Sequence, residues 1–246
     1  MSRVRSPAAE ADLADFLARA EAGLSRDPPG PDDPTVNPRG DHSLEPDGSA
    51  VIPPPPHRRA AVLVPVVART AGLAVVLTQR AGHLRDHSGQ VALPGGKINP
   101  GDASPLAAAL REAEEEIGLA PACVRMLGYL DPYLSATGFL VVPAIGLIDP
   151  EARLAPNPAE VDAIFEVPLS ILTDPARYRL RTRDWQGRAR RFYALPYGER
   201  LIWGVTAGIL HNLHARLGFA AREAGGAALA GSGPLSERVE GIRPRE

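Results

Sequence analysis

The sequence predicts an α/β or α+β sandwich in which a mixed β-sheet lies between helices. Two apolar, β-branched runs, AAVLVPVVA at 60–68 and LAVVLTQRA at 73–81, are joined by a short turn near Gly72 and predict a buried hairpin. Segments at 105–117 and 199–216 instead place apolar residues at helical spacing. With 44% apolar residues among 246, the chain can bury a packed core.

The segments outside the predicted sheet differ from it in composition. Residues 7–21 have helical periodicity and predict a short helix in an N-terminal extension, 1–25. Residues 26–58 are rich in Pro, Gly and Asp, are expected to bury little, and indicate a linker or extended arm. The main domain is therefore expected at 59–220, followed by an Ala/Gly/Ser-rich and then charged tail, 221–246, that is predicted to be disordered.

Further elements follow the hairpin along the chain. GQVALPGGK, 89–97, indicates a strand that runs into a glycine turn. Ser104 is a typical helix N-cap and Pro105 suits the first helical position, while Gly118 is a typical helix stop. PLSIL, 168–172, is expected to turn helical. The remaining strands are expected at 124–131, 140–148, 160–167, 178–184 and 189–195.

Charge and cysteine content argue against several classes of protein. The formal net charge is −2, so the sequence gives no reason to expect a nucleic-acid surface. Cys123 is the only cysteine, which excludes an internal disulfide and thiol zinc clusters and fits the reducing cytoplasm where we expect the protein. The sequence has neither a cleavable leader pattern nor an apolar run of about 20 residues, so neither secretion nor a membrane span is predicted.

The segment LREAEEEIG crowds four glutamates into five positions. On a helix, Glu112, Glu115 and Glu116 are expected to converge, with Arg111 in reach of Glu115. The simplest explanation is a solvated acidic face; the alternative is a bound cation, since carboxylate oxygens are what Mg²⁺ binds. The opposite, core-facing stripe is predicted to contain Leu106, Leu110, Ala113 and Ile117.

The loop LPGGKINPGD, 93–102, favours the cation-binding alternative. Gly95 and Gly96 could form only a tight turn, or they could let backbone N–H groups approach an anion. Asp102 adds a carboxylate near the helix start, and Lys97 is expected to be solvated rather than to bind phosphate. Glycine loop, capped helix and carboxylates occur in this order within about 25 residues, an arrangement that suits a metal and a phosphate together.

This order of residues resembles the Nudix box, in which a glycine and an acidic residue precede R-E-apolar-x-E-E-x-G-apolar. Asp102 stands where Glu is usual, and eight residues rather than seven separate it from the arginine, which leaves its role open. The matching positions are Gly96, Asp102, Arg111, Glu112, Ala113, Glu114, Glu115, Glu116, Ile117, Gly118 and Leu119.

A second stretch, LTQRAGHLRDHSGQVALPGG at 77–96, resembles the extra motif of the coenzyme A pyrophosphatase branch of Nudix hydrolases. Leu93 replaces the usual Phe of that motif. The segments 157–169 and 201–210 resemble the branch too, so the likeness spans roughly 59–216. The matching positions of the motif are Leu77, Thr78, Arg80, Ala81, Arg85, Gly89, Pro94, Gly95 and Gly96.

The resemblance implies an α/β/α sandwich with a mixed sheet, and hydrolysis of a nucleoside diphosphate linked to another group. In this branch the substrate is coenzyme A or a derivative, and the products are 3′,5′-ADP and 4′-phosphopantetheine or its acyl form. Divalent Mg²⁺ or Mn²⁺ is the expected cofactor, because it neutralises the diphosphate and activates water.

We expect Glu112 and Glu116 to be direct metal ligands, and Glu115 to hold a further metal or a metal-bound water. Glu115 and Glu160 are both candidates for the general base; Glu160 could equally be an ordinary carboxylate at a strand end. These roles predict that Glu112→Gln or Glu116→Gln keeps the fold and removes most turnover.

Arg80 and Arg85 are expected to bind substrate phosphate or to position the loop that does so, together with Gly95 and Gly96. The alternative for the arginines is structural pairing with Asp86, Glu115 or Asp102. Two other functions stay open: a Nudix hydrolase of ADP-ribose or a dinucleotide, and a non-catalytic nucleotide-sensing module. The expected partner is thus a small nucleotide, with no nucleic acid or membrane, and a homodimer is compatible with this fold.

Overall fold

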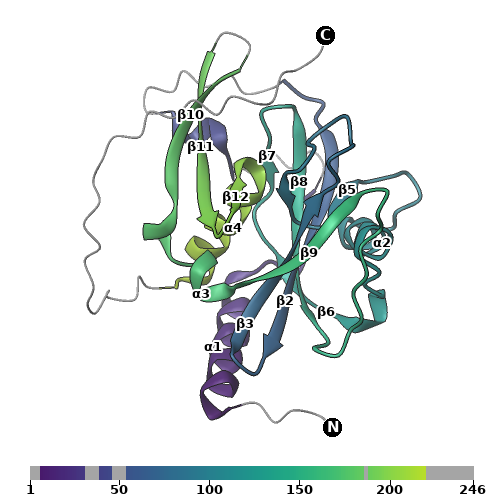
Figure 1. Cartoon of the computed structure of the whole chain (residues 1–246), viewed down its shortest axis with the longest axis vertical. Coiled ribbons are helices and arrows are strands. Elements are labelled where there is room, and N and C mark those ends of the chain that lie inside the picture. The colour runs from purple at the N-terminus through teal and green to yellow at the C-terminus, as the bar shows by residue number, and fades with distance from the viewer. Residues whose placement is uncertain (1–5, 31–38, 46–53, 186–187, 220–246) are drawn as a thin grey trace.

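The computed structural model describes residues 6–30, 39–45, 54–185 and 188–219, and its strands form two sheets (Figure 1). The larger is mixed, with β2 and β8 parallel and most other pairs antiparallel. Its strands are β1 (Arg39–Gly40), β2 (Arg58–Arg69), β3 (Gly72–Arg80), β4 (Val91–Ala92), β5 (Gly95–Lys97), β6 (Val124–Tyr129), β7 (Tyr133–Leu134), β8 (Phe139–Ile148) and β9 (Val161–Pro168). The smaller sheet contains β10 (Arg179–Trp185), β11 (Arg188–Tyr197) and β12 (Arg200–Trp203).

Helices cover both faces of the larger sheet, which confirms the predicted fold class of a mixed sheet between helices. In Figure 1, α2 lies on one side of this sheet, while α4 and the smaller sheet lie on the other. The helices are α1 (Pro7–Gly23), α2 (Pro105–Ile117), α3 (Leu169–Leu172) and α4 (Gly204–Leu217), with short 3-10 turns η1 (Asp41–Leu44), η2 (Pro121–Cys123) and η3 (Pro175–Arg177).

The alternation of β2 divides the core between two layers. Leu63 and Val67 point to the α2 side, where they pack in one cluster with residues of that helix. Val64 and Val66 point to the other side and pack with residues of α1, α3 and α4. A strand that is buried on both faces has a continuous run of apolar residues in its sequence. The hairpin of β2 and β3 was predictable for this reason.

The N-terminal helix α1 docks on the second layer. Ser6 caps it by accepting a hydrogen bond from the backbone N–H of Ala9, and Phe16 is almost fully buried in the core. Arg19 donates to the main-chain oxygen of Gly218 at 2.7 Å, beyond the end of α4. The two chain ends of the described fold are therefore packed together.

Of the predicted linker or extended arm, 26–58, the stretch 39–45 is an arm that pairs with the main domain, and only Gly40 in it is buried. There β1 pairs in parallel with β7 at Tyr133, and the carboxylate of Glu45 accepts a hydrogen bond from the backbone N–H of Arg191 at 2.9 Å. This arm is attached to the domain by main-chain pairing and single polar contacts rather than by apolar side chains. Its composition therefore did not predict the attachment.

The helix expected at 199–216 is partly wrong. Gly198, with φ +57°, makes a turn after β11, and Arg200–Trp203 return as a strand paired with it. Gly204, with φ +60°, then permits the change of direction into α4. The apolar run LIW fits a strand or a helix equally well, and pairing with β11 decides between them.

Among the described residues no helix is long and apolar enough to span a bilayer. The predicted disordered tail, 221–246, lies outside the described residues.

Candidate active site

The acidic helix α2 begins and ends where its local sequence predicts. The hydroxyl of Ser104 accepts a hydrogen bond from the N–H of Ala107 at 3.1 Å, and Pro105 occupies the first turn. Gly118 ends the helix in the left-handed region with φ +66°, a conformation that strongly favours glycine. These caps fix the start and the end of the glutamate-bearing helix.

The face that α2 turns to the sheet differs from the predicted stripe. Ala113 and Ile117 are fully buried as expected, whereas Leu106 and Leu110 are only half-buried. Small residues at 108–109 lie against the sheet instead, which brings the helix close to β2 and β5. As a consequence, the buried face extends to Glu116.

Glu116 is a buried carboxylate, with 3% of its surface exposed. Its Oε2 accepts a hydrogen bond from the N–H of Gly95 at 3.2 Å, and its Oε1 lies 3.7 Å from Nη1 of Arg80. The pKa of Glu116 is raised from its ordinary 4.5 to about 7, mainly by burial. The hydrogen bond from Gly95 and the charge of Arg80 lower it, whereas the carboxylates of Glu160 and Glu112 raise it. A carboxylate in this setting favours a proton or another cation.

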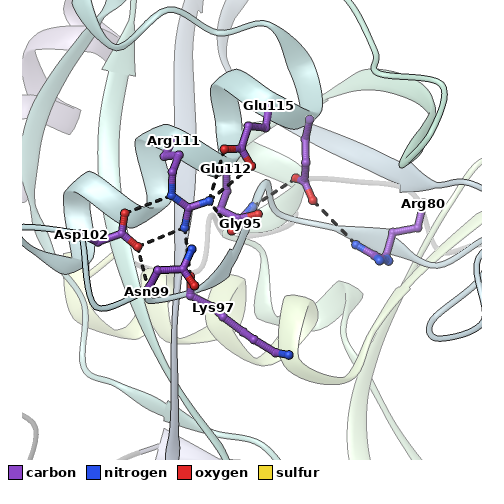
Figure 2. Close-up of polar contacts among 9 residues, drawn as sticks. Arg80, Gly95, Lys97, Asn99, Asp102, Arg111, Glu112 and Glu115 are labelled. Atoms are coloured by element: carbon purple, nitrogen blue, oxygen red, sulfur yellow. Dashed lines mark hydrogen bonds and ion pairs between the residues drawn. The ribbon is translucent and has the colours of Figure 1, made fainter.

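Arg111 connects the helix to the loop before it (Figure 2). Its Nε and Nη2 donate to the two oxygens of Asp102 at 3.0 and 3.1 Å, and its Nη1 donates to Glu112 at 2.8 Å. The same Nη1 lies 3.3 Å from Glu115, which confirms the predicted contact one turn along the helix. Hydrogen bonds from Arg111 and from the N–H of Asn99 lower the pKa of the Asp102 carboxyl.

Asp102 therefore holds the arginine rather than facing the other carboxylates of the helix. Arg111 also donates to the main-chain oxygen of Lys97 at 3.1 Å, so one guanidinium ties both ends of the loop 97–102 to α2. Figure 2 shows the Lys97 side chain extending away from this network. The sequence left the role of Asp102 open. The structure shows that its carboxylate accepts a bidentate contact from Arg111.

The two glycines of β5 lie between α2 and β2. A Cβ at Gly96 would lie 2.5 Å from the carboxylate of Glu112, and a Cβ at Gly95 would lie 2.4 Å from the main-chain oxygen of Ala61. Gly95 also has φ +153°, which L side chains rarely adopt. The close approach to main-chain atoms thus requires glycine at 95, whereas a side chain at 96 would displace the flexible carboxylate of Glu112. Gly95 presents its N–H to Glu116 as well.

The two candidates for the general base differ in their surroundings. The side chain of Glu115 is 52% exposed and lies near Arg111. Glu160 is half-buried in the turn before β9, and its main-chain oxygen accepts from the N–H of Ala81 at 2.9 Å. Its carboxylate is near enough to Glu116 to raise that pKa. The structure therefore brings Glu160 to the buried carboxylate from a different strand.

The donor set of Glu112, Glu115 and Glu116 suits a hard divalent ion, since all its atoms are carboxylate oxygens. Burial of Glu116 among like charges also fits a cation there. In the parts of the chain that the structure describes, no three His, Cys, Asp or Glu side chains come together closely enough to hold a metal ion. The predicted convergence of the three glutamates is not seen, because Arg111 draws Glu112 and Glu115 while Glu116 turns to Gly95. Their assignment as ligands stays a prediction.

The two arginines of the upstream motif lie in different environments. Arg80, at the end of β3, pairs with Glu116 rather than with any of the three partners considered from sequence, and its Nε has no hydrogen-bond partner among the described residues. Arg85 is exposed in the loop after β3 and does not line the cleft described below. A role in phosphate binding stays a prediction for both.

A cleft of about 470 Å³ lies beside these residues, between β5 and the smaller sheet. Gly95, Gly96 and Arg80 line it and also contact the glutamates of α2. Its floor is apolar and includes Val62, Phe139 and Ile209. Among the described residues that line it, only Asp41 is acidic, whereas five are lysine or arginine: Arg80, Lys97, Arg183, Arg190 and Arg191.

Sequence reasoning missed the part of the cleft formed by the smaller sheet. Arg183, Arg190 and Arg191 were seen only as strand residues, because arginines spread along two strands have no fixed motif spacing. Asp41, in the arm, carried no signal at all. The alternation of arginines along β10 and β11 was the one available sign that a face of this sheet is basic.

Comparisons with known proteins agree with these features. The family model described as NUDIX domain matches residues 56–190. The relative named "Uncharacterized Nudix hydrolase NudL" from Escherichia coli strain K12 is 43% identical over 162 residues, 66% of this chain and 84% of the relative. The protein of the same name from Shigella boydii serotype 4 is 44% identical over the same shares.

Among solved structures, the Nudix hydrolase RenU from M. smegmatis aligns at 24% identity and a TM-score of 0.40, over 46% of this chain and 71% of that one. The family match spans more than half of the chain, and the bacterial relatives are covered over most of their length. The chain therefore belongs to the Nudix hydrolase family, which supports a pyrophosphohydrolase activity on small nucleotide-type substrates that generally needs a divalent ion such as Mg²⁺ or Mn²⁺.

Proposed function

We propose that the protein cleaves the diphosphate of coenzyme A or its derivatives to give 3′,5′-ADP and 4′-phosphopantetheine or its acyl form. The observation that carries this proposal is the junction of an acidic and a basic surface at Gly95 and Gly96. On one side lie the glutamates of α2, and on the other lies the basic cleft; Arg80 contacts Glu116 and lines the cleft. A diphosphate at this junction would lie within reach of both.

In this proposal Glu112 and Glu116 hold the divalent ion, and Glu115 supports a further ion or water. The ion, when bound, neutralises the diphosphate and lowers the pKa of water. Arg80 donates to a phosphate oxygen, a role favoured by its unpaired Nε. Gly95 and Gly96, which line the cleft without side chains, let the same phosphate come close to the backbone.

The proton of the attacking water passes to a carboxylate oxygen of Glu115 or of Glu160. The two are separated by comparing Glu115→Gln with Glu160→Gln. Loss of the true base flattens the acidic limb of the pH–rate profile, whereas loss of the other carboxylate lowers turnover without changing the shape of that profile.

The choice of coenzyme A among diphosphates is supported by two features. The motif at 77–96 resembles the coenzyme A branch, and its Arg80 lies at the junction. The cleft also combines a basic lining with an apolar floor, which matches a substrate that joins several phosphates to a long pantetheine arm. ADP-ribose and NADH carry the diphosphate without that arm.

The test is turnover of coenzyme A with Mg²⁺ or Mn²⁺, with products separated by chromatography and with ADP-ribose and NADH run in parallel. We expect 3′,5′-ADP to appear, and to be lost in Glu116→Gln but not in Glu114→Gln, the matched control on the exposed side of the same helix. Cleavage of ADP-ribose or NADH alone would overturn the substrate and keep the reaction. Folded protein that binds metal and cleaves none of them would favour a sensing module.

A further inference from the structure

The basic residues of the cleft fall into two groups on opposite walls. Arg80 and Lys97 belong to β3 and β5 of the larger sheet, next to the glutamates of α2. Arg183, Arg190 and Arg191 belong to β10 and β11 of the smaller sheet. The first group lies next to the proposed position of the diphosphate, whereas the second group belongs to the other sheet.

The second group is built into the strand register. Arg183 and Arg190 are direct cross-strand partners in the antiparallel ladder of β10 and β11, so their side chains leave the same face of the sheet. Both line the cleft. Two guanidinium groups that leave the same face side by side can bind one anionic group together. Asp41 interacts electrostatically with Arg190 from the arm and is the one acidic residue of the described lining.

Beside the arginines lies a pair of aromatic side chains. The rings of Phe192 and Trp203 have centroids 5.4 Å apart and are tilted by 58°. Both are half-buried and both line the cleft, so each keeps part of its ring accessible from it. Phe192 is two residues from Arg190 on the same face of β11. An aromatic surface beside cationic groups is the chemistry that binds a base together with a phosphate.

We propose that this face of the smaller sheet binds the nucleoside end of a substrate that carries a phosphomonoester on its ribose. Arg183 and Arg190 contact the phosphomonoester. Phe192 and Trp203 pack against the base, while the diphosphate lies at the junction with α2. The inference rests on the proposed function, and it names the nucleoside 3′,5′-bisphosphate end as the part of the substrate that is recognised.

The proposed binding face lies across the end of the family match. The match covers residues 56–190 and therefore ends within β11. Phe192 and Trp203 lie beyond it, as does the whole of β12. Arg183 and Arg190 lie within the match, so this face combines arginines of the matched domain with aromatic residues from beyond it.

The test is equilibrium binding by titration calorimetry of 3′,5′-ADP and 5′-AMP to the full-length protein in EDTA. These ligands differ only by the phosphomonoester, and no cleavage is involved. We expect 3′,5′-ADP to bind about tenfold or more tightly than 5′-AMP, as one charge-assisted contact would give. Arg190→Gln should remove this difference and keep the affinity for 5′-AMP. Arg179→Gln, which removes an exposed arginine of β10 outside the cleft, should leave both affinities unchanged.

Two further variants complete the test. Arg183→Gln replaces Arg190→Gln if the latter does not fold, since Arg190 lies near Asp41. Phe192→Leu should weaken both ligands alike. Equal affinities for 3′,5′-ADP and 5′-AMP in the wild type, or no binding of either, would overturn the proposal even if coenzyme A is cleaved. A phosphate-dependent difference that Arg190→Gln abolishes would sustain it even if coenzyme A is not cleaved.

Discussion

Replacing Glu116 with Gln should stabilise the metal-free protein while removing its activity. The carboxylate is 3% exposed, accepts one backbone hydrogen bond from Gly95, and has Arg80 at 3.7 Å. Burial raises its pKa to about 7. At higher pH the ionised carboxylate in this buried position lowers the free energy of unfolding, whereas a neutral amide would not. Glu116 therefore destabilises the metal-free protein.

The sign and the size of this change in stability follow from the pKa values of Glu116 in the unfolded and the folded chain. In the unfolded chain Glu116 titrates near 4.5 and in the folded chain near 7, so the folded state holds an extra proton between these values. The contribution of Glu116 to stability is fully present below pH 4.5 and is lost as pH rises through about 7. At about 1.4 kcal/mol per pKa unit, the loss at pH 8 is about 3 kcal/mol. This loss already includes the attraction of Arg80, so a neutral amide should recover most of it, and we expect a net gain of about 2 kcal/mol.

Thermal unfolding in EDTA at pH 5 and pH 8 measures this effect. For a domain of this size, about 2 kcal/mol corresponds to a rise of about 4–8 °C in Tm. Glu116→Gln should show that rise at pH 8 and a much smaller one at pH 5. Glu115→Gln, at a side chain that is 52% exposed, is the control and should change little at either pH. A Glu116→Gln protein no more stable than wild type at pH 8, or equally stabilised at both pH values, would refute the reasoning.

Two further predictions concern the groups around the glutamates. Gly96→Ala should lower turnover at least about tenfold with little loss of Tm, because its Cβ meets only the flexible carboxylate of Glu112 at 2.5 Å. Gly95→Ala should instead unfold the protein, since its Cβ meets main-chain atoms and its φ is +153°; a folded Gly95→Ala, or a fully active Gly96→Ala, contradicts this argument. Asp102→Asn should lower Tm at neutral pH by weakening the contact with Arg111. Because hydrogen bonds hold the pKa of Asp102 below its ordinary 3.8, that difference should persist to about pH 4 and vanish in stronger acid, as denaturation at several pH values would show.

Features that depend on neighbours in the chain were predictable from the sequence. Ser104, Pro105 and Gly118 set the bounds of α2 through contacts within four residues, and the structure has the helix at 105–117. The hairpin of β2 and β3 follows from apolar runs around a glycine turn. The family itself was identifiable because its glutamates must keep fixed spacings on one helix.

Features that depend on distant segments were not predictable in the same way. β12 was expected to be helical, and only its pairing with β11 makes it a strand. The arm 39–45 joins the fold through β7, about 90 residues away in sequence, so its composition indicated a linker. The cleft has walls from both sheets and from the arm, and a single sequence carries no signal of which strands face one another across a gap.

The acidic helix itself shows how the two kinds of information combine. Counted along the sequence, Glu112, Glu115 and Glu116 are equivalent carboxylates with one arginine among them. In the fold, Arg111 contacts Glu112 and Glu115, whereas Glu116 is buried against β5, accepts a hydrogen bond from Gly95 and has Arg80 at 3.7 Å. The helical spacing thus predicts which carboxylates belong to the proposed metal site, and the packing of α2 on the sheet buries one of them, Glu116, whose charge a cation would offset. Glu116→Gln should therefore weaken Mn²⁺ binding more than Glu115→Gln does. Equal losses of Mn²⁺ affinity in the two variants would show that burial does not distinguish the two carboxylates.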